Sequence, residues 1–315
     1  MVVHIVFAAT SDYAPFALTT SLSVVDKVKS EKCHIHFMYA DIVRKIHHIT
    51  REDTLDMMKS TLALHGADCS IYNIESLVYK LKGQNIGLWG ESISLTHYFY
   101  LLAPEVLDVD KVIFLDTDMI VNTDLSEAYK TDMGNCLLGM GAPRGFESMG
   151  DDVCNSGFVV MNLNLWRKEK TLDTLLEFGR TIQKCNFCDQ NLLHQYFTKK
   201  HADRLFLFDK SYNIFPQCFG DMKLCEMKIL HYTGWGATKP WLDDLAHLGR
   251  ATSLWWFYAR QTPFYEWLKK RNEERNIKRD ERKYFGWKTI GLQKRAFYAF
   301  GRPILKREKK EKPAK

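Results

Sequence analysis

The sequence has little of what marks membrane, fibrous and secreted proteins. Its 315 residues contain no uninterrupted apolar run of the roughly 18–20 residues that a membrane-spanning helix requires. Only 8 Pro and 18 Gly are present and no internal repeat is visible, which excludes collagen-like and solenoid architectures. The eight Cys show no paired spacing except at residues 185 and 188, and no secretory leader precedes the first apolar segment. We therefore expect reduced thiols in a cytoplasmic globular protein.

Basic charge is scarce in most of the chain and concentrated at its end. Residues 265–315 carry 18 Lys and Arg against 7 Asp and Glu, a net charge of +11, which leaves −5 for residues 1–264. Nucleic-acid enzymes usually surround their active site with basic charge, so nucleic acid is not the expected partner. The split predicts two parts, a catalytic domain over residues 1–264 and a basic, aromatic tail over residues 265–315 with its own anionic partner.

Strand-like and helix-like segments alternate through the first part. A near-continuous apolar run at residues 2–9 is typical of a strand buried on both faces of a parallel sheet. Helical spacing of apolar residues follows at 14–29, and a second strand is expected at 33–39. The same alternation predicts helices over about 42–64 and near 92–102, and strands at 71–74 and 111–115. It indicates an α/β fold with a mostly parallel sheet.

Two carboxylates follow the strand at 111–115 directly. Asp116 and Asp118 are two residues apart, so on an extended segment both project to one side and form a hard-oxygen site suited to Mg²⁺ or Mn²⁺. A second pair, Asp108 and Asp110, precedes the strand and is expected to face solvent. Ligands of open α/β sheets bind outside the carboxyl ends of the strands, where the turn at residues 10–13 also lies.

The segment 231–241 is the second candidate. A short apolar run at 227–230 brings His231 to the end of a strand, and imidazole is an acceptable ligand for Mn²⁺. The Gly residues of the segment leave backbone N–H groups accessible to a phosphate, and Lys239 adds a point charge for a diphosphate. The alternative is an ordinary loop in which His231 is hydrogen-bonded and Lys239 is solvated.

Five segments in this order resemble the retaining glycosyltransferases of family 8, in particular the bacterial branch that builds lipopolysaccharide and lipooligosaccharide. The resemblance covers roughly residues 4–241. It rests on residues 5–9 with Tyr13, residues 111–118, Asn155-Ser-Gly157 with residues 161–163 and Trp166, Asp189-Gln190, and residues 231–234 with 239–241.

The resemblance implies a GT-A fold, with a Rossmann-like sheet and a basic C-terminal helical extension. It implies that Asp116, Asp118 and His231 ligate Mn²⁺, or alternatively Mg²⁺, which bridges the two phosphates of a UDP-sugar. Gly234 and Lys239 would assist at the β-phosphate.

The same resemblance assigns the remaining candidate residues. Its implied uridine contacts are Ala8 and Tyr13, with Thr10 standing where relatives often carry an acidic residue that contacts the uracil. The implied sugar pocket consists of Asn155, Ser156, Gly157 and Asp189, with Gln190 nearest the anomeric carbon. Alternatively, residues 155–157 form an ordinary turn into a buried strand, and residues 189–190 cap a helix at 191–197.

The mechanism of retention stays open at this point. Gln190 is a poor nucleophile, and Asp189 is the nearest alternative covalent partner. We favour departure and attack on one face of the sugar, with Gln190 stabilising charge through its amide oxygen. Tyr100 replaces an Arg that is common in the family, which removes a cation near the donor.

The tail combines aromatic residues with Lys and Arg, a pairing that suits an anionic bilayer surface. The leading hypothesis is a hexosyltransferase that uses a UDP-hexose and a lipid-linked saccharide acceptor, peripheral on the cytoplasmic face of the cell membrane. The alternatives are a glycogenin-like self-glucosylating primer and a non-catalytic, membrane-associated relative that only binds nucleotide-sugar. For the tail itself, a solvated helical extension is the alternative.

Overall fold

The computed structural model describes residues 1–41, 51–82, 95–141, 155–182, 188–198, 200–233, 239–242, 249–291, 294–299 and 302–308. The strands within these ranges are β1 (Val2–Ala9), β2 (Lys32–Tyr39), β3 (Asp68–Asn73), β4 (Lys111–Leu115), β5 (Met119–Val121), β6 (Leu138–Gly141), β7 (Phe158–Asn162), β8 (Leu205–Phe208), β9 (Ile229–His231), β10 (Phe285–Gly291), β11 (Lys294–Ala299) and β12 (Arg302–Glu308). The α-helices are α1 (Ala14–Lys27), α2 (Arg51–Leu64), α3 (Glu75–Lys82), α4 (Ala103–Val106), α5 (Ser126–Lys130), α6 (Leu163–Lys168), α7 (Thr171–Arg180), α8 (Cys188–Leu193), α9 (Gly249–Ala259) and α10 (Tyr265–Tyr284).

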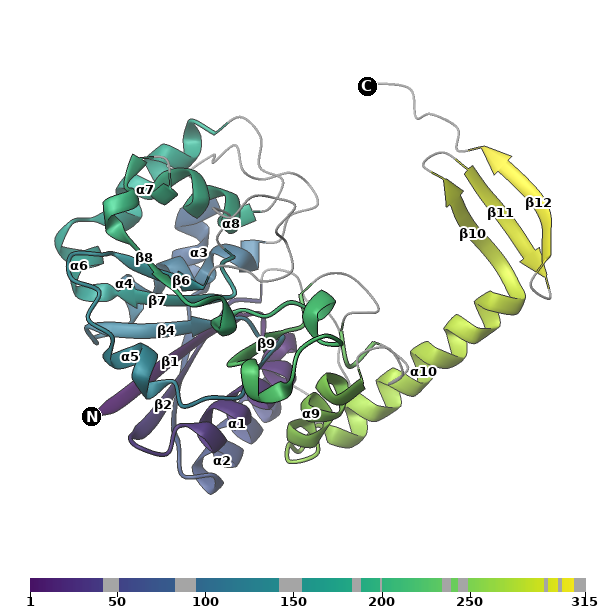
Figure 1. The fold of residues 1–315 in the computed structure, drawn as a ribbon, viewed down its shortest axis with the longest axis horizontal. Coiled ribbons are helices and arrows are strands. Elements are labelled where there is room, and N and C mark those ends of the chain that lie inside the picture. Colours follow the sequence, from purple (N-terminus) through teal and green to yellow (C-terminus); the bar gives the residue numbers. More distant parts are fainter. Residues whose placement is uncertain are drawn as a thin grey trace.

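A seven-stranded sheet forms the centre of the fold, in the order β3-β2-β1-β4-β7-β6-β8 (Figure 1). The first four strands are parallel neighbours, β7 runs antiparallel to β4 and β6, and β8 pairs in parallel with β6. Helices α1 and α2 pack on one face, and a 3-10 helix at Leu95–Leu102 packs on the other together with α4 and α6. The predicted α/β fold with a mostly parallel, helix-flanked sheet is confirmed.

Strand β1 lies between two hydrophobic cores. Val3, Ile5 and Phe7 belong to the core beneath α1 and α2, whereas Val6 belongs to the core on the opposite face. A strand covered on both faces needs apolar side chains in both directions, and the continuous apolar run of the sequence supplies them.

Helix α1 also positions the loop that follows β4. Thr20 Oγ1 donates a hydrogen bond to the carbonyl of Met119 at 2.8 Å, and Ser23 Oγ accepts one from the backbone N–H of Val121 at 2.9 Å. These buried hydroxyls hold β5 against the helix. β5 in turn pairs antiparallel with β9, with Met119 opposite His231. Residues more than 100 positions apart thereby meet at the carboxyl edge of the sheet.

The basic tail begins on the body of the protein. Leu268 in α10 is fully buried in the main core, and Asn272 donates a hydrogen bond to the carbonyl of Pro240 at 3.2 Å. The rest of α10 extends away from the body and leads into the antiparallel sheet β10-β11-β12 (Figure 1). The predicted helical extension is α10; the three strands after it were not predicted. The described helices include none with the length and apolar character to span a bilayer.

Several boundaries differ from those predicted. The helix expected over 42–64 is present as α2, while residues 42–50 lie outside the described residues. The segment 95–102 is helical but adopts the tighter 3-10 form, and Pro104 occupies the first turn of α4 just after it. Residues 92–94 are outside the described residues. The helix expected at 191–197 begins earlier, as α8, and ends in a π-helical turn at His194–Thr198.

Candidate active site

Three predicted metal ligands converge at the carboxyl edge of the sheet. Asp116 and Asp118 follow β4, and His231 ends β9. The His231 Nε2 atom lies 3.4 Å from Asp116 Oδ2 and 3.3 Å from Asp118 Oδ1. His231 is only 1% exposed, whereas the two carboxylates are partly open to solvent. The arrangement offers two carboxylate oxygens and one imidazole nitrogen on a common point.

The second ring nitrogen of His231 is fixed by a residue that the sequence analysis missed. His231 Nδ1 lies 2.9 Å from Asn213 Oδ1, and Asn213 Nδ2 donates to Asn155 Oδ1, also at 2.9 Å. Because Asn213 presents its NH₂ to Asn155, its carbonyl oxygen faces the imidazole, and Nδ1 must be the donor. The Nε2 lone pair of the neutral ring is then directed at the carboxylates. This donor set and tautomer fit a divalent ion such as Mn²⁺.

Charge couples the three ligands. Burial lowers the pKa of His231, but Asp118 and Asp116 outweigh burial and raise it to about 9. Burial raises the pKa of Asp118, but the Lys239 ammonium and His231 together hold that pKa well below its usual range. Asp118 is therefore a carboxylate at any physiological pH. A cation that binds the imidazole must displace its proton, so affinity for such a cation should increase with pH.

Gly157 lies against His231. A Cβ atom at this position would lie 2.4 Å from His231 Cε1 and 2.6 Å from Met119 Cε, distances that real Cβ atoms do not adopt. The backbone carbonyl of Gly157 accepts a hydrogen bond from the N–H of Asp116 at 2.9 Å. Only glycine therefore allows the imidazole to occupy its place beside the carboxylates.

The hydrogen-bond chain continues to Gln190. Asn155 Nδ2 donates to Gln190 Oε1 at 2.9 Å, and Asn155 Oδ1 also accepts from the backbone N–H of Gly157. His231, Asn213, Asn155 and Gln190 thus form one connected series. Asn213 is fully buried, and the one sequence signal for it is an amide in an otherwise apolar stretch, Tyr212-Asn-Ile-Phe215.

Asp189 is buried beside the same series. Tyr100 Oη donates to Asp189 Oδ2 at 2.8 Å, and the Tyr100 ring stacks on Phe114. Burial raises the pKa of Asp189 to about 6; a hydrogen bond from Ser156 opposes the increase. Asp189 belongs to the first turn of α8, but its side chain faces Tyr100 instead of capping the helix. Tyr100, the departure from the family pattern, therefore supplies a neutral donor where a cation was expected.

The predicted uridine contacts lie at the same edge. β1 and β4 pair with Val6 opposite Phe114, and extending that register by two residues places Ala8 beside Asp116. Thr10 and Tyr13 follow β1, with the Tyr13 side chain exposed. A carboxylate that the sequence analysis did not single out, Asp41 after β2, accepts hydrogen bonds from the N–H and the hydroxyl of Ser11.

Lys239 reaches the site from a distant segment. Its ammonium pairs with Asp118 Oδ2 and lies 5.8 Å from the centre of the Trp241 ring. Trp241 packs on Phe16 of α1, with ring centres 4.4 Å apart. The alternative in which Lys239 is merely solvated is therefore not what the structure contains. Gly234, the other predicted phosphate contact, lies outside the described residues.

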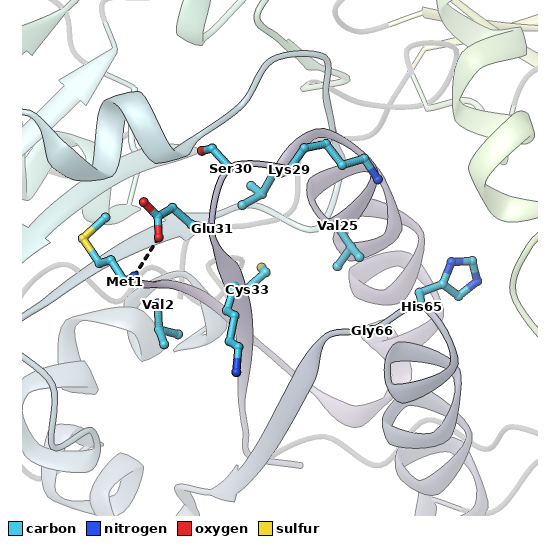
Figure 2. Close-up of a pocket in the computed structure, with 11 residues that line it drawn as sticks. Met1, Val2, Val25, Lys29, Ser30, Glu31, Cys33, His65 and Gly66 are labelled. Carbon is cyan, nitrogen blue, oxygen red and sulfur yellow. Dashed lines mark ion pairs between the residues drawn. The ribbon is translucent and has the colours of Figure 1, made fainter.

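A surface hollow of about 640 Å³ lies at the opposite end of the sheet (Figure 2). The Glu31 carboxylate in it is paired with the Met1 amino group at 2.7 Å and with Lys130 at 2.6 Å. Burial raises the pKa of the Cys33 thiol to about 12, so this thiol is not a nucleophile. The hollow offers no reactive group that matches those at the carboxyl edge.

Comparison with known sequences gives related proteins of greater length. The probable glycosyl transferase Gly of Streptococcus gordonii is 26% identical over 245 residues, which cover 75% of this chain and 33% of that protein. Glycosyltransferase GlyA of Streptococcus pneumoniae is 26% identical over 195 residues, 59% of this chain and 27% of that protein. The chain thus spans between a quarter and a third of the length of these relatives.

Solved structures share the fold. The galactosyltransferase LgtC, determined in complex with donor and acceptor sugar analogs, superposes with a TM-score of 0.62 and 21% identity, over 82% of this chain and 96% of that chain. GlyE of Streptococcus pneumoniae superposes with a TM-score of 0.60 and 19% identity, over 89% of this chain and 65% of that one. The predicted GT-A fold is confirmed. The sequence model of glycosyl transferase family 8 matches residues 4–245, so the chain belongs to this family of sugar-transferring enzymes.

Proposed function

We propose that the protein is a retaining hexosyltransferase that moves galactose or glucose from a UDP-sugar to a saccharide acceptor, with Mn²⁺ as its metal ion. The observation that carries the proposal is the hydrogen-bonded series from His231 through Asn213 and Asn155 to Gln190. It links His231, a ligand of the metal ion that would bind the diphosphate, to Gln190, the group that would face the anomeric carbon.

Family 8 enzymes with the GT-A fold use a nucleotide-sugar and a divalent metal. In this chain Asp116, Asp118 and His231 would hold the ion, which when bound neutralises the charge that develops on the departing diphosphate. Lys239 pairs with Asp118, and we assign its ammonium to the β-phosphate, the role that its place beside the metal ligands supports.

Gln190 is oriented for the charge that develops on the sugar. Its Oε1 atom uses one lone pair for Asn155 Nδ2, which fixes the plane of the amide and leaves the other lone pair for the substrate. An amide oxygen stabilises a developing positive charge without forming a stable covalent bond. This supports attack and departure on one face of the sugar.

Asp189 and Tyr100 would form the wall that recognises sugar hydroxyls. A carboxylate accepts hydrogen bonds from two hydroxyls, and Tyr100 holds one of its oxygens at 2.8 Å. Because Tyr100 is neutral, the pocket has no arginine charge here to attract an anionic sugar. A neutral hexose is therefore the better donor, in line with the structural neighbour LgtC, which is a galactosyltransferase.

The acceptor is proposed to be lipid-linked, as in surface glycan synthesis, and the tail to dock on the anionic cytoplasmic face of the cell membrane. The support is the net charge of +11 on residues 265–315. The division into a catalytic part, 1–264, and a tail, 265–315, is kept as a proposal. Leu268 and Asn272 nevertheless contact the body, so a truncation that tests the tail should keep residues up to 274.

The decisive experiment measures UDP release from a panel of UDP-sugars with and without Mn²⁺. Gln190→Ala should lower turnover by about 10–10³-fold with donor affinity within a few-fold of wild type, since Gln190 acts on transition-state charge. Gln195→Ala is the matched control, because the Gln195 side chain donates to Asn191 Oδ1 one turn earlier. No UDP release with any donor, or equal losses in both variants, would contradict the proposal.

A separate experiment tests the tail. Protein truncated after residue 274 should release UDP at the wild-type rate but no longer sediment with phosphatidylglycerol vesicles, because each basic residue near an anionic surface contributes about 1 kcal/mol. An intact protein that ignores such vesicles at low salt would contradict membrane docking without affecting the proposed chemistry.

A further inference from the structure

A cluster of three histidines lies apart from the candidate active site. His4 in β1 and His34 in β2 are directly opposite each other in the parallel register, and His36 follows two residues later on the same face. His4 is five residues before Ala9, so the cluster is about 16 Å from the carboxyl edge of the sheet. The pattern His-x-His on one strand with a His on its neighbour places three imidazoles on one side of a rigid support.

The three rings are close enough to share one ion. One ring nitrogen of each lies within 4.8 Å of the others, and His4 Nδ1 is 2.9 Å from His36 Nε2. The outer nitrogens are held by hydroxyls on the next strand, β3. His36 Nδ1 contacts Tyr72 Oη at 3.2 Å, and His34 Nε2 contacts Ser70 Oγ at 2.8 Å. Such outer contacts are what orients histidines that bind metals.

The local electrostatics keep the rings neutral. Burial, together with the neighbouring His34 and His4, lowers the pKa of His36 to about 3. Burial also lowers the pKa of His4 and of His34. At neutral pH all three rings therefore retain a lone pair, which is the form that binds metal.

We propose that His4, His34 and His36 form a second metal site, for a late first-row divalent cation of which Zn²⁺ is the representative. A set of three imidazoles favours Zn²⁺, Cu²⁺ or Ni²⁺ over Mg²⁺ and Mn²⁺, whose preferred ligands are carboxylate oxygens. Water would complete a tetrahedral sphere. The ion would join β1 to β2 near the start of the chain and stabilise the folded state in proportion to its affinity.

One rearrangement accompanies binding. His34 stacks on His36 with ring centres 4.2 Å apart and planes 6° apart. An ion lies near the plane of each imidazole that binds it, so His34 must turn about its side-chain bonds, away from the orientation in which it now contacts Ser70, to share the ion with His36. Because its side chain is partly exposed, this turn requires no change in the core.

The test uses the full chain without a histidine tag, in the Asp116→Asn, Asp118→Asn background that weakens the other metal site. Titration calorimetry with Zn²⁺ should give one tight site. His4→Gln or His34→Gln should each weaken it by at least about tenfold, because either change removes one ligand of three. His65→Gln, an exposed histidine elsewhere, should leave it unchanged. Both test positions are partly exposed, so these variants should fold, and circular dichroism checks that they do.

Two further readouts complete the test. Zn²⁺ should raise the thermal midpoint of the background protein but not that of its His34→Gln form. The electron paramagnetic resonance spectrum of bound Cu²⁺ should show coupling to several imidazole nitrogens. Zinc affinity that is equal in the background protein and in both histidine variants would overturn the proposal. With Asp116 and Asp118 intact, the histidine variants should keep Mn²⁺-dependent UDP release, so the two sites fail separately.

Discussion

Two buried histidines, His36 within β2 of the seven-stranded sheet and His231 at the end of β9, have pKa values shifted in opposite directions. Burial and, in the same direction, its imidazole neighbours lower the pKa of His36 to about 3. Burial lowers the pKa of His231 as well, but Asp118 and Asp116 reverse the outcome and raise it to about 9. Burial always lowers the pKa of a histidine, so the charge of its neighbours decides whether the buried ring is neutral or protonated. The carboxylates of the candidate active site suit hard cations, and the three imidazoles of β1 and β2 suit late transition metals.

Removal of one carboxylate should have the largest effect of the changes proposed here, and it should reduce the difference between the pKa values of His231 and His36. Asp118→Asn removes a proposed metal ligand and the negative charge that most strongly stabilises the protonated His231. Turnover should fall by at least about 10³-fold. In metal-free protein the pKa of His231 should fall below about 9. Kinetics and a histidine NMR titration in the presence of chelator measure the two effects. An unchanged pKa would show that Asp118 is not the source of the shift.

Asp189 extends the comparison to a buried acid: burial and Asp116 raise its pKa, whereas His97 and the hydroxyls of Ser156 and Tyr100 lower it. Its pKa of about 6 lies above the ordinary value of an aspartic acid, so the folded state holds the proton more tightly than the unfolded chain. The resulting stabilisation is complete below about pH 4 and is lost as the pH rises through 6. Asn cannot ionise and still accepts from Tyr100. The stability of Asp189→Asn relative to wild type should therefore increase by up to about 3 kcal/mol between pH 4 and pH 7.

Urea unfolding at the two pH values, with chelator present, measures this difference. Groups that titrate in both proteins cancel in the comparison. A variant whose relative stability is the same at pH 4 and pH 7 would mean that Asp189 is ionised normally, and Tyr100→Phe then serves to show whether the hydroxyl compensates for burial.

The role of Gly157 can be tested without touching any charged group. Gly157→Ala should displace His231 and weaken Mn²⁺ binding by about 10–100-fold, since the added methyl group overlaps the ring. Gly220→Ala is the control, because a Cβ at Gly220 meets nothing within 4 Å. Calorimetry with Mn²⁺ and UDP compares the two. Equal affinities would mean that the loop yields to the methyl group and the close approach is not needed.

The sequence predicted those parts of the site whose position depends on residues next to them in the chain. Asp116 and Asp118 directly follow an apolar strand, so their place at a sheet edge follows from the strand alone. Asn213 could not be found this way, because its partners His231 and Asn155 are brought together by the Ile214–Leu230 bridge and by β7. The sequence did not predict strands β10–β12, because closely spaced Lys and Arg interrupt the alternation of apolar and polar residues in these segments.

The smallest expected effect separates the two functions of Asn213. In Asn213→Asp a carboxylate oxygen still accepts from His231 Nδ1, a carboxylate–histidine arrangement that is common in metal sites. The same side chain can no longer donate to Asn155, so the Asn155 amide loses one of the contacts that hold it toward Gln190. Mn²⁺ affinity should stay within a few-fold of wild type while kcat falls about tenfold. Asn213→Ala removes both hydrogen bonds and should weaken the metal site as well, by about 10–100-fold. Parallel losses of affinity and kcat in Asn213→Asp would mean that the metal ligand and Gln190 are not positioned independently, and the series would then act as one rigid unit.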